Sequence, residues 1–262
     1  MNITFYKYEG TGNDFIMIDN RDNSFPKKNI ALVNKLCDRH FGIGADGLIL
    51  LEYDAETDFK MVYFNADGNE GTMCGNGGRC IVAFAYKLDI ISEKTTFNAV
   101  DGLHHASIEN GLVSLQMIDV NKVDVHANHV FVNTGSPHHV QLVKSIDTYN
   151  VVTNGRKLRN EYGDEGSNIN FVEQINKSTF KVRTYERGVE DETLACGTGV
   201  TAVAIAMYKT NKTNLKVIKL PVLGGELEVS FNVENNQYKN VFLKGPATFV
   251  FKGIINIDHI NA

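Results

Sequence analysis

Two short stretches, Met73-Cys74-Gly75-Asn76-Gly77 and Ala195-Cys196-Gly197-Thr198-Gly199, each place a cysteine and a Gly-x-Gly turn just before an apolar run. The two runs, residues 80–85 and 200–207, contain no charged side chain. A helix that is apolar on every side must be buried on every side. We therefore expect two central helices, over residues 75–87 and 197–208, each enclosed by strands.

The two stretches belong to a longer repeat in which equivalent positions lie 122 residues apart. Besides the cysteines, the residues that recur at this offset are Tyr63 and Tyr185, Glu70 and Glu192, Tyr86 and Tyr208, and Lys87 and Lys209. The repetition indicates a duplicated fold with halves 1–120 and 121–262. The last strand, residues 247–255, either stays with the second half or returns to complete the first.

Aromatic and β-branched residues predict many short strands around these helices. The predicted strands cover residues 3–8, 15–19, 48–53, 59–65, 113–117, 130–133, 168–173, 179–185, 215–220, 226–231, 241–243 and 248–255, and residues 30–37 form a short amphipathic helix. Turn residues occur at Asp67-Gly68, Asn110-Gly111, Asn154-Gly155 and Gly224-Gly225. The fold class is therefore α/β (α+β), with two pseudo-symmetric domains, each a curled, mostly antiparallel sheet around a central helix and a cleft between them.

Composition excludes several classes of function. The net charge is −5 and no run of Lys or Arg occurs, so we expect a small-molecule ligand, with no nucleic acid and no membrane as partner. No apolar stretch approaches the ~20 residues that span a bilayer, and residues 1–10 resemble a strand more than a signal peptide. A cytoplasmic location follows. The four cysteines lack a Cys-x-x-Cys pair, so we expect neither structural zinc nor a disulfide scaffold.

Cys74 and Cys196 have the sequence context of reactive thiols. Amide groups at a helix N-terminus favour a thiolate and bind anions, and the glycines allow a carboxylate to approach the backbone. Two such ends facing one another would grip one carboxylate and stabilise a carbanion at the neighbouring carbon. The other two cysteines, Cys37 and Cys80, are expected to be buried small hydrophobes.

The ordered motifs resemble the diaminopimelate epimerase family over essentially the whole chain. The segments that carry the resemblance are Gly10-Thr11-Gly12-Asn13-Asp14-Phe15, Gly42-Ile43-Gly44-Ala45-Asp46-Gly47, Asn65-Ala66-Asp67-Gly68, Tyr185-Glu186-Arg187-Gly188-Val189-Glu190 and the two cysteine turns. The resemblance implies a cofactor-independent isomerase that interconverts LL- and meso-diaminopimelate for lysine and peptidoglycan synthesis, usually as a homodimer.

The resemblance also assigns roles to individual residues. One cysteine, as thiolate, removes the α-proton while the other, as thiol, protonates the opposite face; in the LL to meso direction Cys74 is the donor and Cys196 the acceptor. His138 and Glu186 tune the cysteine pKa values, and Arg187 fits the distal carboxylate. The residues implied in substrate binding are Asn13, Asn65, Gly75, Asn76, Asn168, Glu186, Arg187, Gly197 and Thr198. No metal or other cofactor is implied.

Two positions depart from the family pattern, and two other functions stay open. Gly47 stands where many members have glutamine, and Ser136 opens a Ser-Pro-His segment where many have Asn-Pro-His. Substrate contacts at these two positions are therefore in doubt.

One alternative function is that of a proline or hydroxyproline racemase, which typically carries histidine at the place of Asn76 and needs no clamp like Arg187. Another is a redox protein whose two cysteines form a switch disulfide.

Overall fold

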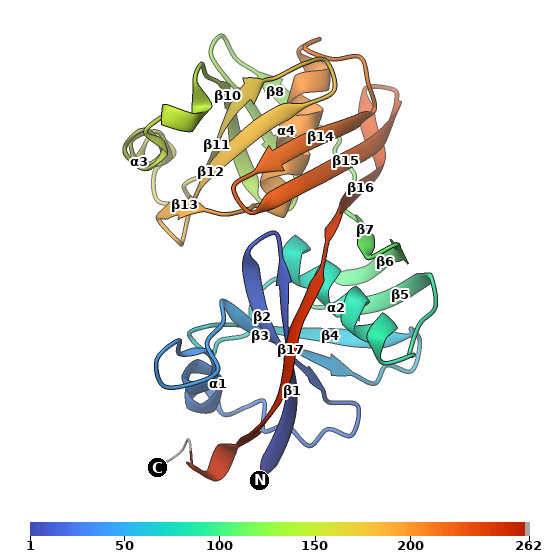
Figure 1. Cartoon of the computed structure of the whole chain (residues 1–262). Helices are drawn as coiled ribbons and strands as arrows, with labels where there is room; N and C mark the ends of the chain where they lie inside the picture. Colours follow the sequence, from blue (N-terminus) through green and yellow to red (C-terminus); the bar gives the residue numbers. More distant parts are fainter. Residues whose placement is uncertain (260–262) are drawn as a thin grey trace. The chain divides into compact units, whose positions relative to one another are not determined.

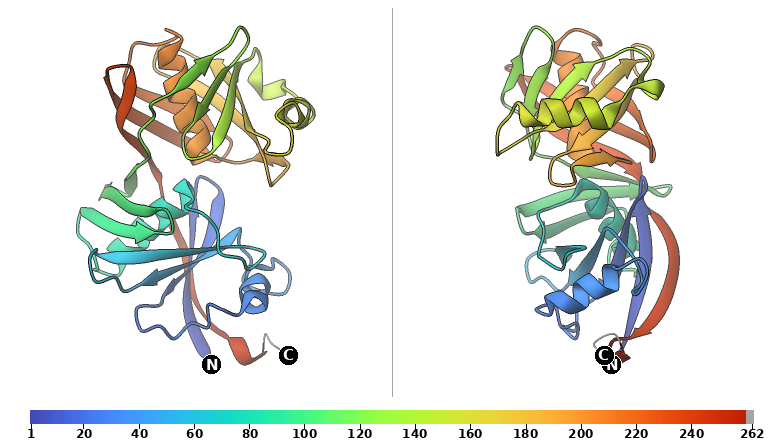
Figure 2. Two further views of the ribbon diagram at one scale, coloured as in Figure 1. Left: turned by 180° about the vertical axis from the view of Figure 1, so that it is seen from behind. Right: turned by 90° about the vertical axis from the view of Figure 1, so that its left-hand side faces the viewer.

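The computed structural model describes residues 1–259 and divides into two compact units (Figure 1). Unit 1 contains Met1–Leu115 and the segment that begins at Pro246, and unit 2 contains Gln116–Gly245. Both units combine strands with a few helices, as expected for the α/β class. The last strand, whose place the sequence left open, pairs antiparallel with the first strand of the chain and so lies in unit 1 (Figure 2).

Unit 1 is a mostly antiparallel sheet around one helix. The order of its strands is β7, β6, β5, β4, β3, β2, β1, β17, with parallel pairing only at β2–β3 and β4–β5. Helix α2 contacts six of these strands, which explains why its residues from position 75 to 85 are all buried. The elements are β1 (Asn2–Gly10), β2 (Asn13–Asp19), α1 (Ile30–Cys37), β3 (Gly47–Glu52), β4 (Phe59–Asn65), α2 (Gly75–Lys87), β5 (Lys94–Ala99), β6 (Gly102–Glu109), β7 (Leu112–Gln116), β17 (Thr248–Asn256) and a 3-10 turn, η2 (Ile257–His259).

Unit 2 repeats the arrangement around helix α4. One sheet has the order β13, β12, β11, β10, β9, β8, and β14, β15 and β16 pair in sequence beside it. The elements are β8 (Val123–Val125), β9 (Val130–Asn133), β10 (Pro137–Leu142), η1 (Ile146–Thr148), α3 (Val151–Asn160), β11 (Asn168–Gln174), β12 (Phe180–Glu186), β13 (Asp191–Thr193), α4 (Gly197–Lys209), β14 (Val217–Val222), β15 (Gly225–Glu234) and β16 (Gln237–Pro246). Both expected central helices are confirmed to within one residue.

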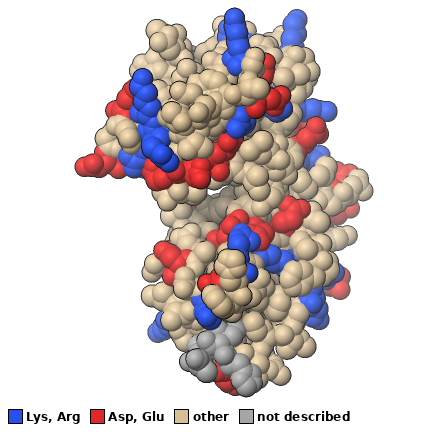
Figure 3. Space-filling model, turned by 60° about the vertical axis from the view of Figure 1, so that its left-hand side comes forward, with Lys and Arg blue, Asp and Glu red and all other residues tan. Residues whose placement is uncertain are grey.

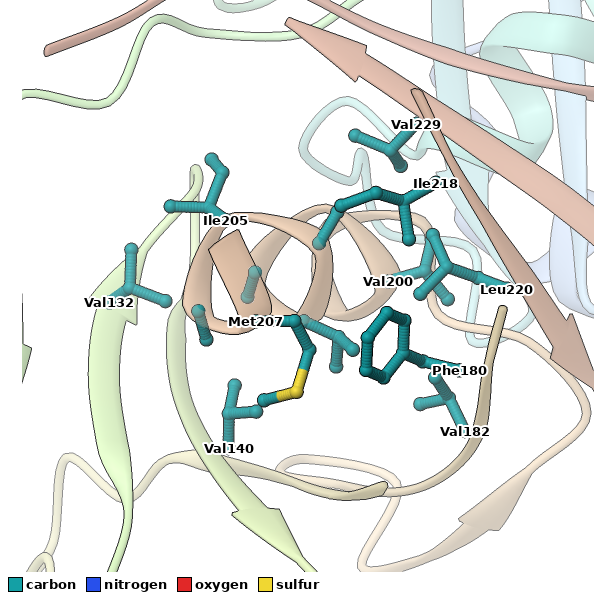
Figure 4. Packing of buried hydrophobic residues seen from close by; sticks show 14 of the residues in the cluster. Val132, Val140, Phe180, Val182, Val200, Ile205, Met207, Ile218, Leu220 and Val229 are labelled. Atoms are coloured by element: carbon teal, nitrogen blue, oxygen red, sulfur yellow. The ribbon is translucent and has the colours of Figure 1, made fainter. Parts of the chain in front are cut away.

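The core of unit 2 forms where aliphatic side chains of the strands pack against α4 (Figure 4). Each of these side chains removes an apolar surface from water, which is the main favourable contribution to folding. Because α4 presents apolar groups in every direction, strands from both sides of the unit contribute to one core. The labelled residues are Val132, Val140, Phe180, Val182, Val200, Ile205, Met207, Ile218, Leu220 and Val229.

Most predicted turns are confirmed, but one is wrong. Asn110 and Gly111 both have positive φ between β6 and β7, as a tight hairpin requires. Asn154-Gly155, expected to be a turn, lies inside helix α3. Helix α3 packs on β11 and β12, and a Cβ on Gly155 would lie 2.4 Å from Cβ of Tyr185. Glycine is therefore needed there for close packing rather than for chain reversal.

The surface carries charges of both signs. Figure 3 shows Lys and Arg side chains interspersed with Asp and Glu on the visible face of each unit. No helix in residues 1–259 has the length and apolar character that crossing a membrane would require.

Gly47, one of the two departures from the family pattern, lies where a neighbouring ring leaves no room for a side chain. A Cβ at this position would be 2.5 Å from Cε2 of Tyr63 and 2.6 Å from the backbone oxygen of Phe64, both on the adjacent strand β4. Tyr63 thus occupies the space that a longer residue at position 47 would need.

Three imidazole rings stack across the edge of the sheet in unit 2. His129 lies between His126 and His139, with ring centroids 4.5 Å and 4.2 Å away. Nδ1 of His139 is 2.8 Å from the hydroxyl of Tyr162, and Nε2 is 3.2 Å from Oε1 of Gln141. Burial and the neighbouring imidazoles lower the pKa of His139 to about 4, against the opposing hydrogen bond of Gln141.

The packing at Gly47 predicts a loss of stability on substitution. Gly47→Ala should lower the free energy of unfolding by about 1–3 kcal/mol, because the added methyl overpacks the β3–β4 pair. A urea titration with a constant m value measures this. Combining the change with Tyr63→Leu should restore only part of the loss, since the oxygen of Phe64 stays in place. An unchanged urea midpoint in Gly47→Ala would show that the strands separate easily.

The stacked histidines predict a loss of stability in acid. His139 stays neutral when folded, but its pKa returns to about 6.5 on unfolding, so the stabilisation is complete above pH 6.5 and falls towards pH 4. At pH 5 the loss from this one group is ~2 kcal/mol. Urea midpoints of the wild type and of His139→Gln between pH 7.5 and 5 measure it, with His40→Gln, at an exposed histidine of unit 1, as control. The idea fails if His139→Gln loses as much stability in acid as the wild type.

Candidate active site

Each of the two cysteines that the repeat singles out occupies the N-cap position of a central helix. Cys74 precedes α2 with φ −110° and ψ 124°, and Cys196 precedes α4 with φ −119° and ψ 110°. In this position the side chain lies beside the first amides of the helix, which have no carbonyl one turn earlier to bond. Gly75 and Gly197, which supply the first of these amides, are both buried. Each unit therefore brings a thiol to a helix end suited to bind an anion.

In unit 1 the side chain of Asn13 lies beside Cys74. Oδ1 of Asn13 is 3.8 Å from Sγ of Cys74 and accepts a hydrogen bond from Nδ2 of Asn76 at 3.4 Å. Nδ2 of Asn13 donates to Oδ2 of Asp46 at 2.5 Å, which fixes the orientation of the amide. The start of β2 and the N-terminus of α2 thus bring the predicted residues Asn13, Cys74 and Asn76 together.

Arg79 supports this arrangement from within α2 and was not predicted. Its guanidinium is fully buried and donates to Oδ1 of Asn76 at 3.2 Å, to the carbonyl of Gly75 at 3.3 Å and to the hydroxyl of Thr11 at 3.0 Å. Burial lowers the pKa of Arg79, and the neighbouring Cys80 and Cys74 oppose this effect. A charged residue directly before the apolar run of residues 80–85 was the signal in the sequence.

Asn65 and Tyr63 lie at the end of β4. Asn65 is exposed, and a Cβ on Gly71 would lie 3.0 Å from its Nδ2, so its amide faces the loop that leads to Cys74. Burial raises the pKa of Tyr63, and the nearby Cys74 raises it further. The phenol that fills the space beside Gly47 is therefore a neighbour of the Cys74 thiol.

In unit 2 two oxygen-bearing side chains approach Cys196. Sγ of Cys196 is 3.5 Å from the hydroxyl of Thr198, and Cys196 also forms a side-chain hydrogen bond with Glu186. Glu186 accepts a second bond from the hydroxyl of Thr193 at 2.6 Å. Burial raises the pKa of Glu186, while the hydrogen bonds from Thr193 and Cys196 oppose this effect. A carboxylate with a raised pKa next to a thiol is suited to exchange a proton with it.

His138 is fully buried on β10 and bonds an asparagine that was not predicted. Nδ1 of His138 is 3.1 Å from Nδ2 of Asn170, and Nε2 has no hydrogen-bond partner among residues 1–259. Burial, and then the positive charge of Arg187, lower the pKa of His138 to about 3. The imidazole is therefore neutral at physiological pH.

The side chain of Asn168 holds the backbone of Arg187, the predicted arginine. Its Oδ1 accepts from the amide of Arg187 at 3.0 Å, and its Nδ2 donates to the hydroxyl of Ser136 at 3.3 Å. The guanidinium of Arg187 donates to the carbonyl of Glu165 at 2.5 Å. Ser136, the second departure from the family pattern, thus contacts one of the predicted residues.

The structure groups the predicted residues within each unit. Asn13, Gly75 and Asn76 surround Cys74, whereas Asn65 lies at the neighbouring strand end. Sequence reasoning missed the residues that orient these groups: Asp46, Arg79, Thr193 and Asn170. In the described part of the chain, no three His, Cys, Asp or Glu side chains are arranged to hold a metal ion.

Comparisons with known proteins place this geometry in a family. The family model described as "Diaminopimelate epimerase" matches residues 5–123 and 130–250. A diaminopimelate epimerase from Flavobacterium psychrophilum is 65% identical over 253 residues, which are 95% of this chain and 99% of that protein. A diaminopimelate epimerase from Aquifex aeolicus is 42% identical, and the match covers 95% of this chain and 96% of that protein.

Solved structures share the fold at low sequence identity. A Bacillus anthracis phenazine biosynthesis protein of the PhzF family has a TM-score of 0.76 and 15% identity, with 98% of this chain and 99% of that chain covered. A hydroxyproline epimerase from Agrobacterium vitis has a TM-score of 0.70 and 13% identity, with 97% and 92% covered. Motifs, fold and full-length relatives agree, and the chain belongs to the diaminopimelate epimerase family.

Proposed function

We propose that this chain interconverts LL- and meso-diaminopimelate by a two-base mechanism. The observation that carries the proposal is that both repeat cysteines, Cys74 and Cys196, occupy the N-cap positions of the buried helices α2 and α4. In the LL to meso direction the thiolate of Cys196 takes the α-proton, and the thiol of Cys74 gives its own proton to the opposite face. The sulfurs end with exchanged protonation states, which solvent then resets.

The surroundings of the two cysteines support these different roles. Oδ1 of Asn13 faces Sγ of Cys74, and an acceptor at that distance suits a protonated thiol. Cys196 has the carboxylate of Glu186 as a hydrogen-bond partner, and this carboxylate has a raised pKa. Glu186 can receive the proton of Cys196 and leave a thiolate, whose charge the helix N-terminus stabilises. His138 completes the pair of residues that tune the cysteine pKa values.

The amides at the two helix starts provide the cradle for the reacting carboxylate. Gly75 and Asn76 supply it in α2, and Gly197 and Thr198 in α4, where they would also stabilise the enolate-like carbanion. Asn13, Asn65 and Asn168 contribute side-chain amides for the polar groups of the substrate, and Glu186 fits its amino end. Arg187, whose backbone is held by Asn168, fits the distal carboxylate.

The reaction requires no pyridoxal phosphate or metal, because the two thiols and the helix amides supply both proton transfers and the stabilisation of charge. The activity belongs to lysine and peptidoglycan synthesis, and we place the protein in the cytoplasm, where thiols stay reduced. The racemase alternative has less support, because a hydroxyproline epimerase and a probable proline racemase share only the fold with this chain, at 13% and 14% identity.

We also propose a homodimer. The outermost strand of unit 1, β17, carries exposed apolar side chains: Val250, Phe251 and Ile254 have exposed fractions of 52%, 44% and 70%. An apolar edge strand is a common site for association and an aggregation hazard if left open. A second copy of this chain is the occupant that fits the family.

Solvent deuterium provides the decisive test of the mechanism. In deuterated water without pyridoxal phosphate, LL-diaminopimelate should invert and gain one deuterium at the inverted carbon. Cys74→Ala and Cys196→Ala should each lower kcat/KM by at least ~10³-fold, the upper range for general acid–base catalysis. Cys37→Ala, at a buried cysteine at the end of α1, should stay within a few-fold of the wild type. Wild-type rates in either active-site variant would overturn the mechanism. Turnover of proline but not of diaminopimelate would instead favour the racemase alternative.

Sedimentation velocity tests the homodimer. The wild type should sediment with the mass of two chains at micromolar concentration, and the double variant Val250→Lys, Ile254→Lys should sediment as one chain because two charges would be buried. Glu109→Lys, an exposed change on β6, is the control and should remain dimeric. A wild type that sediments as a single chain at all concentrations refutes the assembly.

A further inference from the structure

One buried polar residue outside the predicted site makes hydrogen bonds that specify more than packing. Asn170 lies on β11 opposite Val140 of β10 and is fully buried. Its Nδ2 is 3.1 Å from the carbonyl oxygen of His139 and 3.1 Å from Nδ1 of His138. Its Oδ1 accepts from the hydroxyl of Thr184 at 3.0 Å. Every polar atom of this amide therefore has a partner.

These partners fix which way the amide points. A backbone carbonyl can only accept a hydrogen bond, so the atom of Asn170 that faces the carbonyl of His139 must be the nitrogen. The oxygen then faces Thr184, whose hydroxyl can donate. The same nitrogen faces His138, and it has hydrogens to donate but no lone pair to offer.

The orientation of the amide decides the position of the proton on His138. A ring nitrogen that faces an amide donor must be the acceptor, so Nδ1 of His138 carries no hydrogen. A neutral imidazole has one N–H, which must then be on Nε2. Burial keeps the ring neutral. Nε2, which has no hydrogen-bond partner among residues 1–259, is thereby left as a donor.

Asn170 also connects this ring to the helix start that carries Cys196. A Cβ on Gly199 would lie 2.4 Å from Oδ1 of Asn170 and 3.2 Å from Sγ of Cys196. The amide therefore packs directly against the first turn of α4. A change in its orientation would disturb the imidazole and the helix start together.

We propose that Asn170 is a positioning residue that holds His138 as the neutral Nε2–H tautomer, so that this ring serves the active site as a hydrogen-bond donor and never as a base. The proposal rests on the proposed role of His138 in the site. It makes that role more specific. A neutral imidazole that donates a hydrogen bond stabilises an anion, whereas a basic imidazole would form the anion by taking a proton.

Nitrogen NMR of the imidazole rings tests the tautomer without any assay of activity. In uniformly ¹⁵N-labelled protein, long-range proton–nitrogen correlations distinguish a protonated from an unprotonated ring nitrogen, and His138→Gln assigns the signals. The wild type should show His138 with a protonated Nε2 and a bare Nδ1, unchanged between pH 5.5 and 8. A protonated Nδ1 in the wild type overturns the proposal.

Two variants distinguish the effect of the Asn170 amide as a hydrogen-bond donor from the effect of its packing. Asn170→Asp replaces the donor with a carboxylate, which can only accept, so Nδ1 of His138 should become protonated and kcat/KM should fall at least ~10-fold. Thr184→Val removes the hydroxyl on the other side of the amide, and the Nε2–H tautomer should persist. An unchanged kcat/KM in Asn170→Asp with a protonated Nδ1 would also overturn the proposal. A wild type that is inactive on diaminopimelate would refute the proposed function and leave the tautomer result standing.

Discussion

The constraint on which the structure depends is the burial of two helices that have no polar face. Such a helix can exist in water only if strands cover it on every side, and α2 and α4 are covered in this way in their own units. The strands that cover the sides of the helix leave no room for a ligand there. At the N-terminus of the helix, the first backbone amides lack carbonyl partners and require polar or anionic ones. Cys74 and Cys196 stand at these ends. The burial of the two helices therefore both holds the fold together and positions the two cysteines.

Duplication supplied two equal frameworks, but the surroundings of the two thiols have diverged. At the offset of 122 residues, Asn76 corresponds to Thr198 and the buried Arg79 to Thr201, whose hydroxyl donates to the carbonyl of Gly197. Cys74 lies in a network of amides and one guanidinium, whereas Cys196 has a carboxylate as its partner. An acid and a base need unlike environments, so this divergence suits a reaction in which the two cysteines exchange a proton with opposite faces of one carbon.

The sequence predicted elements well wherever the pattern is local. Apolar runs located both central helices, and Asn110-Gly111 located a hairpin because its backbone needs positive φ. The prediction of a turn at Asn154-Gly155 was wrong, because this glycine allows close packing against Tyr185, a residue distant in the chain. For the site, the motifs predicted the residues that we propose contact the substrate. The residues that orient them, such as Asp46 and Asn170, were not found because their partners come from other strands.

The sequence by itself determined the repeat, the two cysteines at the helix starts and the family, since each of these depends on residue type and spacing along the chain. Tertiary structure alone decided which strand completes unit 1, why position 47 must be glycine beside Tyr63, and which nitrogen of His138 bears the proton. Those outcomes depend on strand pairing and on hydrogen bonds between distant segments. Only the packed chain brings such groups within bonding distance.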